Sequence, residues 1–333
     1  MNEVLVRSGG MSTTVQDAGR PGQYAIGMPP SGAMDQFSFA AANALVGNPV
    51  EAAALEATYL GPELELPDHR LVAVTGADAA VTLNGDEVPQ WTTLSAGPGD
   101  VLAIAGASAG TRPYIAVSGG IDVPVYLGSR STYTLTGIGG HEGRALEDGD
   151  RLPLGQRPER APREGTSVPA HLRPELAEIA ELRLVVGLCS YRLTRRALEN
   201  FLGTTWKVTK DADRVGYRLR GGELEFEPRE QPFGAGSDPA NVVDLGYPIG
   251  SVQVPGGDEP IVLLNDAVTG GGYATIGTVA SADRDRIAQV RTGGRVSFTA
   301  VDVDGAMDAR RQRRVQLAEV REAVSGRTQS SGS

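Results

Sequence analysis

Short apolar runs of strand length recur along the whole chain, and several of them alternate apolar and polar residues with a period of two. In the first half the runs cover Val4–Val6, Leu71–Thr75, Ala80–Leu83, Val101–Ala105 and Tyr114–Val117. In the second half they read LRLVVGL, TWKVT, ELEFE, SVQVP, IVLLND and RVSFTAV. Many short strands separated by Gly and Pro turns predict a mainly β fold of the barrel or sandwich type.

Turn and helix signals stand between these runs. Asn84-Gly85 predicts a two-residue hairpin turn, because both residues accept a positive φ angle. Asp35 is the predicted N-cap of a helix with apolar side chains at helical spacing, and Gly47 followed by Pro49 predicts its end. Further helices are predicted from Thr194 to Gly203, from Ser281 onward, and over Met307–Val324.

The segment Gln156–Pro174 is rich in proline and charge and almost free of large apolar residues, as expected of a linker. It predicts an N-terminal lobe over residues 1–155, a linker over 156–174 and a C-terminal lobe over 175–306. Residues 307–333 are expected to form a C-terminal helix and a disordered tail, because SGRTQSSGS has nothing to bury.

Composition and charge narrow the class of protein. The 333 residues carry a net charge of −10, which argues against a nucleic-acid-binding protein because phosphate binding needs a basic face. Cys189 is the only cysteine, which excludes an internal disulfide and a multi-cysteine zinc site. The sequence contains neither a long apolar run nor a recognisable secretory signal, so we expect a cytoplasmic protein.

Several local patterns invite a catalytic interpretation, but none is specific. GASAG at Gly106–Gly110 matches a nucleophile elbow, yet a strand-like run follows it, so a hairpin loop is expected. The three histidines lack neighbours at metal-ligand spacing, so no metal site is expected. The run VTGGGYATIG leaves open an anion-binding loop and a tight turn. Arg214, beside Asp213, is either one partner of a surface ion pair or a ligand of an anionic group.

Four longer segments together carry a resemblance to a known family. They are TTVQDAGRPGQYAIGMPPSGAMDQFSFAAANALVGN (Thr13–Asn48) with the AAALEATYLGPELEL that follows it, IAVSGGIDVPVYLGSRSTY (Ile115–Tyr133), ADRVGYRLRG (Ala212–Gly221) and GSVQVPGGDEPIVLLNDAVTGGGYATIG (Gly250–Gly277). On these segments the chain resembles the family of allophanate hydrolase subunit 2, KipA-like proteins and the C subunit of 5-oxoprolinase. The family's domain also forms part of the carboxyltransferase region of urea carboxylase. The resemblance covers nearly the whole chain apart from the linker and the tail.

The resemblance implies two cyclophilin-like β-barrel lobes and a site assembled from distant segments. The family's signature loop matches Pro29, Pro30, Ser31, Gly32, Met34 and Asp35. The residues carried over as catalytic are Asp35, Arg214 and Asp266, with no acid, base or nucleophile assigned among them. The residues carried over as substrate-binding are Arg20, Pro30, Ser31, Gly32, Met34, Asn43, Arg130, Tyr217, Gln253, Thr269, Gly271 and Tyr273. We expect all of these residues to converge on one cleft.

Two segments depart from the family pattern. Leu188 and Cys189 stand where the family typically has Gly-Pro-Gln followed by an aspartate. Val268 and Gly270 stand where a glutamine and a threonine are usual. These changes remove polar groups near the expected site, and they bear on both the substrate and the activity.

The resemblance implies three alternative functions. The first is a subunit of an ATP-dependent 5-oxoprolinase, which opens 5-oxoproline to glutamate together with a KipI-like subunit 1 and a LamB/YcsF-like third subunit. ATP is then used by the assembled complex, and no ATP-binding motif is recognised in this chain. The second is a carboxyltransferase of the urea carboxylase type, with biotin supplied in trans because Ala-Met-Lys-Met is absent. The third is a non-catalytic KipA-like antagonist of a kinase inhibitor.

Overall fold

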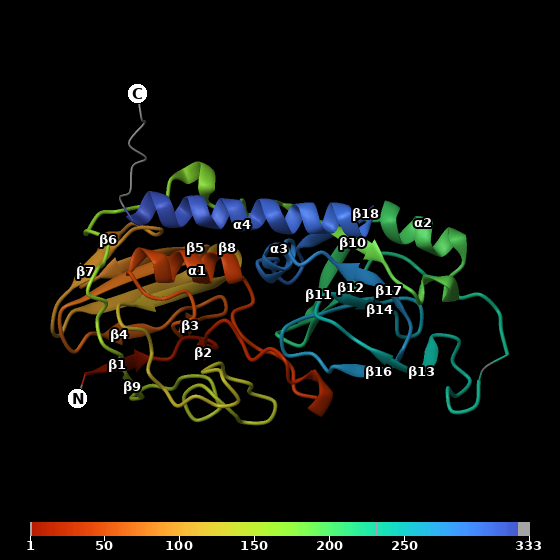
Figure 1. Cartoon of the computed structure of the whole chain (residues 1–333), viewed down its shortest axis with the longest axis horizontal. Coiled ribbons are helices and arrows are strands. Elements are labelled where there is room, and N and C mark those ends of the chain that lie inside the picture. The colour runs from red at the N-terminus through yellow and green to blue at the C-terminus, as the bar shows by residue number, and fades with distance from the viewer. Residues whose placement is uncertain (1, 231, 326–333) are drawn as a thin grey trace. The chain divides into compact units, whose positions relative to one another are not determined.

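The structure is a computed structural model that describes residues 2–230 and 232–325, and the chain forms two units (Figure 1). Unit 1 comprises Met1–Arg20, Ser31–Glu175 and Arg314–Ser333, and unit 2 comprises Pro21–Pro30 and Leu176–Arg313. The expected linker, residues 156–174, therefore belongs to unit 1, and each unit takes in a segment from the other half of the chain. The predicted disordered tail after Ser325 lies outside the described residues.

Unit 1 is built on one antiparallel sheet of nine strands, in which the long strands β5 and β8 pair from Val72↔Val117 to Leu83↔Leu102. The path through the sheet is β2-β3-β8-β4-β1-β9, and β5 also pairs with β6 and β7. The strands are β1 (Glu3–Ser8), β2 (Thr14–Gln16), β3 (Ala54–Glu56), β4 (Glu63–Glu65), β5 (Arg70–Leu83), β6 (Asp86–Val88), β7 (Leu94–Ala96), β8 (Val101–Val117) and β9 (Arg151–Pro153).

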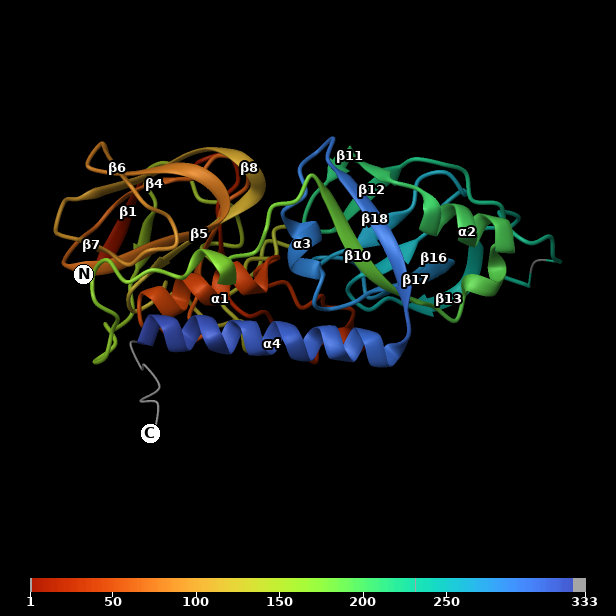
Figure 2. The ribbon, with the colours of Figure 1, turned by 90° about the horizontal axis from the view of Figure 1, so that it is seen from above.

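Two apolar clusters fill unit 1. One is formed by the inward side chains of the sheet, among them Val4, Leu64 and Ile115. The other lies between the sheet, helix α1 (Gln36–Leu45) and the end of helix α4 (Val303–Ser325), where Val320 and Val324 are buried. Helix α1 lies against β5 and β8, which places the N-terminus of α1 beside the sheet (Figure 2). A short 3-10 helix, Ala170–Leu172, adds Leu172 to the second cluster.

Unit 2 contains a closed barrel with the strand order β10-β17-β14-β15-β12-β11-β18. Only β10 and β18 pair in parallel, and the other neighbours are antiparallel. The barrel strands are β10 (Ile179–Val186), β11 (Trp206–Ala212), β12 (Gly216–Arg220), β14 (Ser251–Gln253), β15 (Ile261–Leu263), β17 (Thr275–Val279) and β18 (Arg295–Val301). The remaining elements are the pair β13 (Asn241–Gly246) and β16 (Gly270–Tyr273), the helices α2 (Arg195–Gly203) and α3 (Arg284–Ala288), and the 3-10 turns Tyr24–Ile26 and Ser190–Arg192.

The prediction of a mainly β protein with two β lobes is confirmed, with a closed hydrogen-bonded ring in unit 2 and an open sheet in unit 1. The predicted hairpin turn is also confirmed, because Leu83 pairs with Asp86 while Asn84 and Gly85 have φ angles of 55° and 88°. Helix α3 begins three residues after the predicted Ser281, and α4 begins four residues before the predicted Met307.

Two local predictions are wrong. ELEFE, Glu223–Glu227, is not a strand: Phe226 makes one isolated bridge to Leu193, and the segment runs into Pro228, which has no N–H for a ladder. GASAG is not a hairpin loop, because Gly106–Gly110 lies inside the long strand β8 opposite bulged positions of β5. No helix in the described part of the chain combines the length and the apolar character that a membrane span needs.

Candidate functional site

The signature loop ends in a buried helix cap. Asp35 lies at the N-cap of α1 with 1% of its surface exposed. Its Oδ1 accepts a hydrogen bond from the backbone N–H of Ser38 at 2.9 Å, and its Oδ2 accepts one from the Ser38 hydroxyl at 2.6 Å. The carboxylate therefore satisfies a donor that the first turn of a helix leaves unpaired. The N-cap prediction is confirmed, and a catalytic role for Asp35 stays a prediction.

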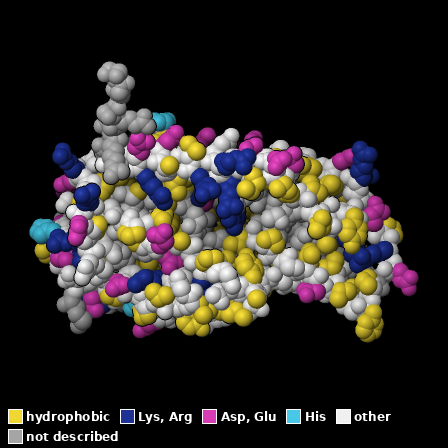
Figure 3. Space-filling model, viewed as in Figure 1, with side chains coloured by type: hydrophobic (Ala, Val, Ile, Leu, Met, Phe, Trp, Pro, Cys, Tyr) yellow, Lys and Arg dark blue, Asp and Glu magenta, His cyan; other side chains and the backbone are white. Residues whose placement is uncertain are grey.

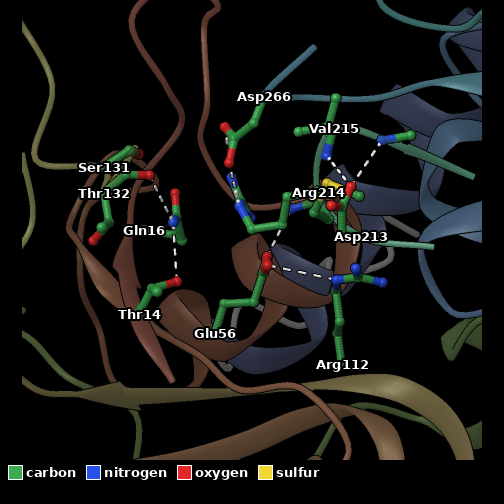
Figure 4. A network of polar contacts seen from close by, with 12 residues as sticks. Thr14, Gln16, Glu56, Arg112, Ser131, Thr132, Asp213, Arg214, Val215 and Asp266 are labelled. Atoms are coloured by element: carbon green, nitrogen blue, oxygen red, sulfur yellow. Dashed lines mark hydrogen bonds and ion pairs between the residues drawn. The ribbon is translucent and has the colours of Figure 1, made fainter. Parts of the chain in front are cut away.

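A buried polar network holds the residues just before this cap. Glu56 on β3 accepts hydrogen bonds through Oε2 from the backbone N–H of Met34 and from the Tyr114 hydroxyl, both at 2.8 Å. The Tyr114 oxygen accepts a further bond from the N–H of Asp35 at 2.8 Å. The Nε of Arg112, also buried, lies 3.6 Å from Glu56 Oε1 (Figure 4). Burial, then the carboxylates of Glu56 and Asp35, raise the pKa of Tyr114 well above its ordinary value, so its hydroxyl stays protonated and donates.

A second carboxylate joins two of the family segments in unit 1. Asp17 accepts through Oδ1 from the hydroxyls of Ser129 and Ser131, at 2.6 and 2.5 Å. Its Oδ2 accepts from the backbone N–H of Arg130 at 2.6 Å. Arg20, with 1% of its surface exposed, donates to the carbonyl oxygen of Ser131. These bonds fasten the segment before the signature loop to the segment Ser129–Ser131.

Two of the predicted polar residues of unit 1 are occupied by local contacts. Asn43 is buried on α1, where its amide donates to the Ala52 carbonyl at 2.9 Å and its Oδ1 accepts from Asn48 at 3.0 Å. The guanidinium of Arg130 donates to the Asp122 carboxylate at 2.6 Å and is one-third exposed. In the structure Asn43 therefore fixes the loop after α1, and Arg130 forms a surface ion pair.

Ser31 and Gly32 give the signature loop its shape. Both have positive φ angles, 52° and 84°. A Cβ atom on Gly32 would lie 2.8 Å from the Cα of Gly19, so the two backbone segments pack directly against each other. Ser31 is buried, with 2% of its surface exposed.

In unit 2 an ion pair connects two of the predicted site residues. Arg214 donates through Nε to Asp266 Oδ2 at 2.7 Å and through Nη2 to Oδ1 at 3.3 Å (Figure 4). The side chains are 14% and 4% exposed, so this pair is largely buried. Asp213 faces the turn instead, because its Oδ1 accepts from the N–H groups of Val215 and Gly216 at 2.7 and 3.1 Å. Arg214 therefore does form an ion pair, but with Asp266 and in a largely buried position, and binding of an anionic group by Arg214 stays a prediction.

The glycine-rich run near Arg214 packs around a buried tyrosine. The Tyr247 hydroxyl donates to the Tyr273 carbonyl at 2.8 Å and accepts from the Tyr273 N–H at 2.7 Å. It also hydrogen-bonds to Gln253, and burial raises the pKa of Tyr247. A Cβ on Gly271 would lie 2.9 Å from Tyr247 Cε2, which explains a glycine there. The Thr269 carbonyl accepts the backbone N–H of Tyr247 at 2.9 Å.

Within the run VTGGGYATIG, Gly270–Tyr273 form strand β16 paired with β13, and the end of the run enters strand β17. The glycines of this run therefore lie in a strand and form neither of the two loop types that the sequence left open. An apolar cluster of Tyr247, Leu263 and Ala267, with Val215 packed against it, brings the Arg214 turn and the glycine-rich run together within unit 2.

The remaining predicted residues differ in their exposure to solvent. Tyr217 is buried in barrel strand β12, with its oxygen 3.5 Å from the Ala288 carbonyl. Tyr273 is 41% exposed, and Pro30 is half-buried at the end of the segment Pro21–Pro30. Among the departures from the family pattern, Leu188 and Val268 are 96% and 52% exposed, while Cys189 is half-buried.

Sequence reasoning missed four residues that organise these contacts: Asp17, Glu56, Tyr114 and Tyr247. For Glu56 a sequence signal exists, because it is the one charged residue within the apolar run Ala52–Ala57, a pattern typical of a paired buried carboxylate. Within the described residues no group of three metal-ligating side chains is present, and His141 Nε2 lies 3.3 Å from Asp150 Oδ1. Unit 1 thus presents a rigid, capped loop, and unit 2 presents an oriented arginine beside a tyrosine-supported strand.

These features define a mainly β protein of two lobes, each with a buried polar network next to a glycine-containing segment. A family model described as "Carboxyltransferase domain, subdomain A and B" matches residues 26–300, so the chain belongs to this carboxyltransferase-domain family, as its motifs predicted.

Relatives fall into two groups. The chain is similar to the C subunit of 5-oxoprolinase from Escherichia coli, with 36% identity over 306 residues, covering 92% of this chain and 93% of that protein. It is 37% identical over 308 residues to the urea amidolyase of Lachancea kluyveri, covering 89% of this chain and 17% of that protein. The chain therefore spans about one-sixth of the length of that amidolyase. The crystal structure of Kluyveromyces lactis urea amidolyase matches with a TM-score of 0.90 and 33% identity over 96% of this chain and 20% of that one.

Proposed function

We propose that this chain is a subunit of an ATP-dependent 5-oxoprolinase, which opens 5-oxoproline to glutamate, and that it acts with a KipI-like subunit 1. The observation that supports this proposal most is the reciprocal match with the C subunit of 5-oxoprolinase, which runs along 93% of that protein. The similarity to the urea amidolyase is confined to 17% of a much longer chain. Nearly the whole length of that bacterial relative thus has a counterpart in this chain.

The chemistry needs recognition of a carboxylate beside a lactam ring. Arg214 suits that carboxylate, because a guanidinium presents its donors in a fixed fork. Asp266 holds two of the Arg214 nitrogens at 2.7 and 3.3 Å, so in this proposal Asp266 orients Arg214 and does not act as a base. In unit 1 the cap at Asp35 makes the signature loop rigid, which favours a preorganised arrangement of its binding residues.

In the proposal ATP is used by the assembled complex, and no ATP-binding motif is recognised in this chain. The glycine-rich run that invited comparison with a phosphate loop is strand β16, whose backbone pairs with β13. Hydrolysis of ATP is therefore assigned to another subunit, the KipI-like subunit 1 or a LamB/YcsF-like third subunit. The residues of this chain contribute binding and orientation of the substrate.

The test is reconstitution. The chain is co-expressed with its KipI-like subunit 1 and a LamB/YcsF-like subunit, and glutamate release from 5-oxoproline is measured with and without ATP. We expect ATP-dependent release that is lost when this chain is omitted. An assembled complex that neither releases glutamate nor binds 5-oxoproline contradicts the proposal.

Variants of the ion pair sharpen this test. D266N leaves Arg214 without its oriented carboxylate, and we expect kcat/KM for 5-oxoproline to fall by about tenfold or more, mainly through KM. R220Q is the matched control, because Arg220 pairs with Glu259 on the surface of the same unit and is 76% exposed. Equal activity of D266N and R220Q, with both variants folded, contradicts the role of Arg214.

A second candidate, a biotin-dependent carboxyltransferase, is favoured by the family model and by the TM-score of 0.90 to the urea amidolyase. In that case biotin reaches the site on a separate carrier, since the chain lacks Ala-Met-Lys-Met. Carboxylation of urea by this chain and its KipI-like subunit 1, together with a biotin carboxylase and a biotin carrier, would identify this function. Binding of the KipI-like subunit without turnover in either assay would favour the non-catalytic KipA-like alternative.

A further inference from the structure

A pocket of about 550 Å³ lies in unit 1 at the C-terminal half of α1, between that helix, the segment 160–162 and the end of α4. Most of its wall is aliphatic, with side chains of Ala40, Ala44, Val50, Pro162 and Val324. Its size falls within the roughly 300–1,000 Å³ that is typical of small-molecule sites. Since Asp35 caps the other end of α1, this pocket is separate from the signature loop.

Two arginines supply the charge of this pocket. Arg160 and Arg321 line it, and within residues 2–230 and 232–325 neither guanidinium has a hydrogen-bond or ion-pair partner. No acidic side chain of the described residues lines the pocket. Both basic and acidic side chains lie along α4 (Figure 3), so the positive charge at the pocket comes from the two lining residues Arg160 and Arg321.

The partial negative charges at the C-termini of α1 and α4 offset the positive charge of the two arginines only in part. Each helix C-terminus carries about −0.5 elementary charge, so two arginines leave a net charge of about +1 around the pocket. The α1 carbonyls are further satisfied, because those of Asn43 and Ala44 accept N–H groups of the residues that follow the helix.

Gly47 allows the segment 160–162, which carries Arg160, to pack closely against the end of α1. Its φ angle is 75°, and a Cβ there would lie 2.9 Å from the Cα of Ala161 and 3.0 Å from the carbonyl oxygen of Arg160. The segment thus packs directly on the end of α1. This backbone contact positions Arg160 at the wall of the pocket.

We infer that this pocket binds an organic carboxylate with a short aliphatic body, its head group between Arg160 and Arg321 and its chain along Ala40, Ala44 and Val324. Arginine matches a carboxylate through paired, charge-assisted hydrogen bonds. The small side chains of the wall leave room for methylene groups, whose burial is favourable. This inference does not depend on the proposed function.

The test is calorimetric titration of the full chain with octanoate, and with octylamine and 1-octanol as probes of the same length. We expect saturable binding of one octanoate per chain, and at least tenfold weaker binding of the cationic and neutral probes. The double variant R160Q/R321Q should lose octanoate binding by about tenfold or more. Arg163 follows this segment directly, is exposed and does not line the pocket, so R163Q should bind octanoate like the natural chain.

A44L tests the aliphatic wall, since it fills the pocket without changing charge, and it should also weaken octanoate binding. Inorganic phosphate probes the head-group site alone and should bind more weakly than octanoate. Equal binding of octanoate and octylamine overturns the inference, as does binding that R160Q/R321Q leaves unchanged. Thermal unfolding and circular dichroism of each variant confirm that a loss of binding is not a loss of fold.

Discussion

At the scale of single residues, the carboxylate of Asp35 caps helix α1. Both carboxylate oxygens of Asp35 accept hydrogen bonds from Ser38, and the backbone N–H of Asp35 donates to the Tyr114 oxygen. A carboxylate held in this way fixes the start of α1, which follows Ser31 and Gly32 closely in the chain. Asp35 can therefore both cap the helix and form part of the site. Substitutions of Asp35 distinguish its contribution to stability from its contribution to activity.

D35A should lower the free energy of unfolding by about 2 kcal/mol, the upper end of the range for N-cap removal, because the site is buried and the Ser38 hydroxyl loses its acceptor. D35N keeps a capping oxygen and should cost less. Urea unfolding measures both, and T194A is the matched control at the more accessible cap of α2. If D35N keeps its stability but the reconstituted complex loses activity, the carboxylate does more than cap.

At the scale of elements, helix caps and turns could be predicted from local sequence, and the pairing of distant strands could not. The caps at Asp35 and Thr194 and the Asn84-Gly85 turn depend on a few neighbouring residues, and the structure has all three. The β-strand status of Gly106–Gly110 depends on β5, more than twenty residues earlier in the chain. The same limit applies to the site: the motifs indicated Arg214 and Asp266, but Glu56 and Tyr114 become partners only through the β3–β8 pairing.

The loop before β9 should make stability depend on acid pH. Arg144 donates to both oxygens of Asp150, at 2.8 and 2.9 Å, and this contact lowers the pKa of Asp150 to about 2 from an ordinary 3.8. Because the folded pKa is the lower one, the stabilisation is complete above about pH 4 and is lost as the pH falls from 4 through 2.

Protonation of Asp150 should lower the free energy of unfolding by about 2 kcal/mol at most. D150N should remove this part of the pH dependence. Urea unfolding at pH 7, 5, 4 and 3 measures it. E142Q is the control, since Glu142 pairs with the same Arg144 but is 68% exposed. A parallel pH dependence for D150N and the natural chain would rule out Asp150 as its source.

At the scale of the whole molecule, the two units are not two consecutive halves of the chain. Residues 21–30 belong to unit 2, and the described C-terminal residues from Arg314 belong to unit 1. A cut after Glu175 would therefore leave each fragment without a segment that its unit uses. For unit 1 the missing segment carries core side chains, because Val320 and Val324 are 0% and 3% exposed within the α1 cluster.

The end of α4 should accordingly be part of the stability of unit 1. V320A removes two methyl groups from a fully buried position and should cost about 2 kcal/mol of unfolding free energy. V315A, five residues earlier on the same helix and 58% exposed, should change it by less than about 0.5 kcal/mol. A chain ending at Arg313 should unfold at lower temperature than one ending at Ser325 and should bind a dye for exposed apolar surface. Equal stability of V320A and V315A would mean that α4 merely lies on unit 1 and that the α1 cluster is complete without it.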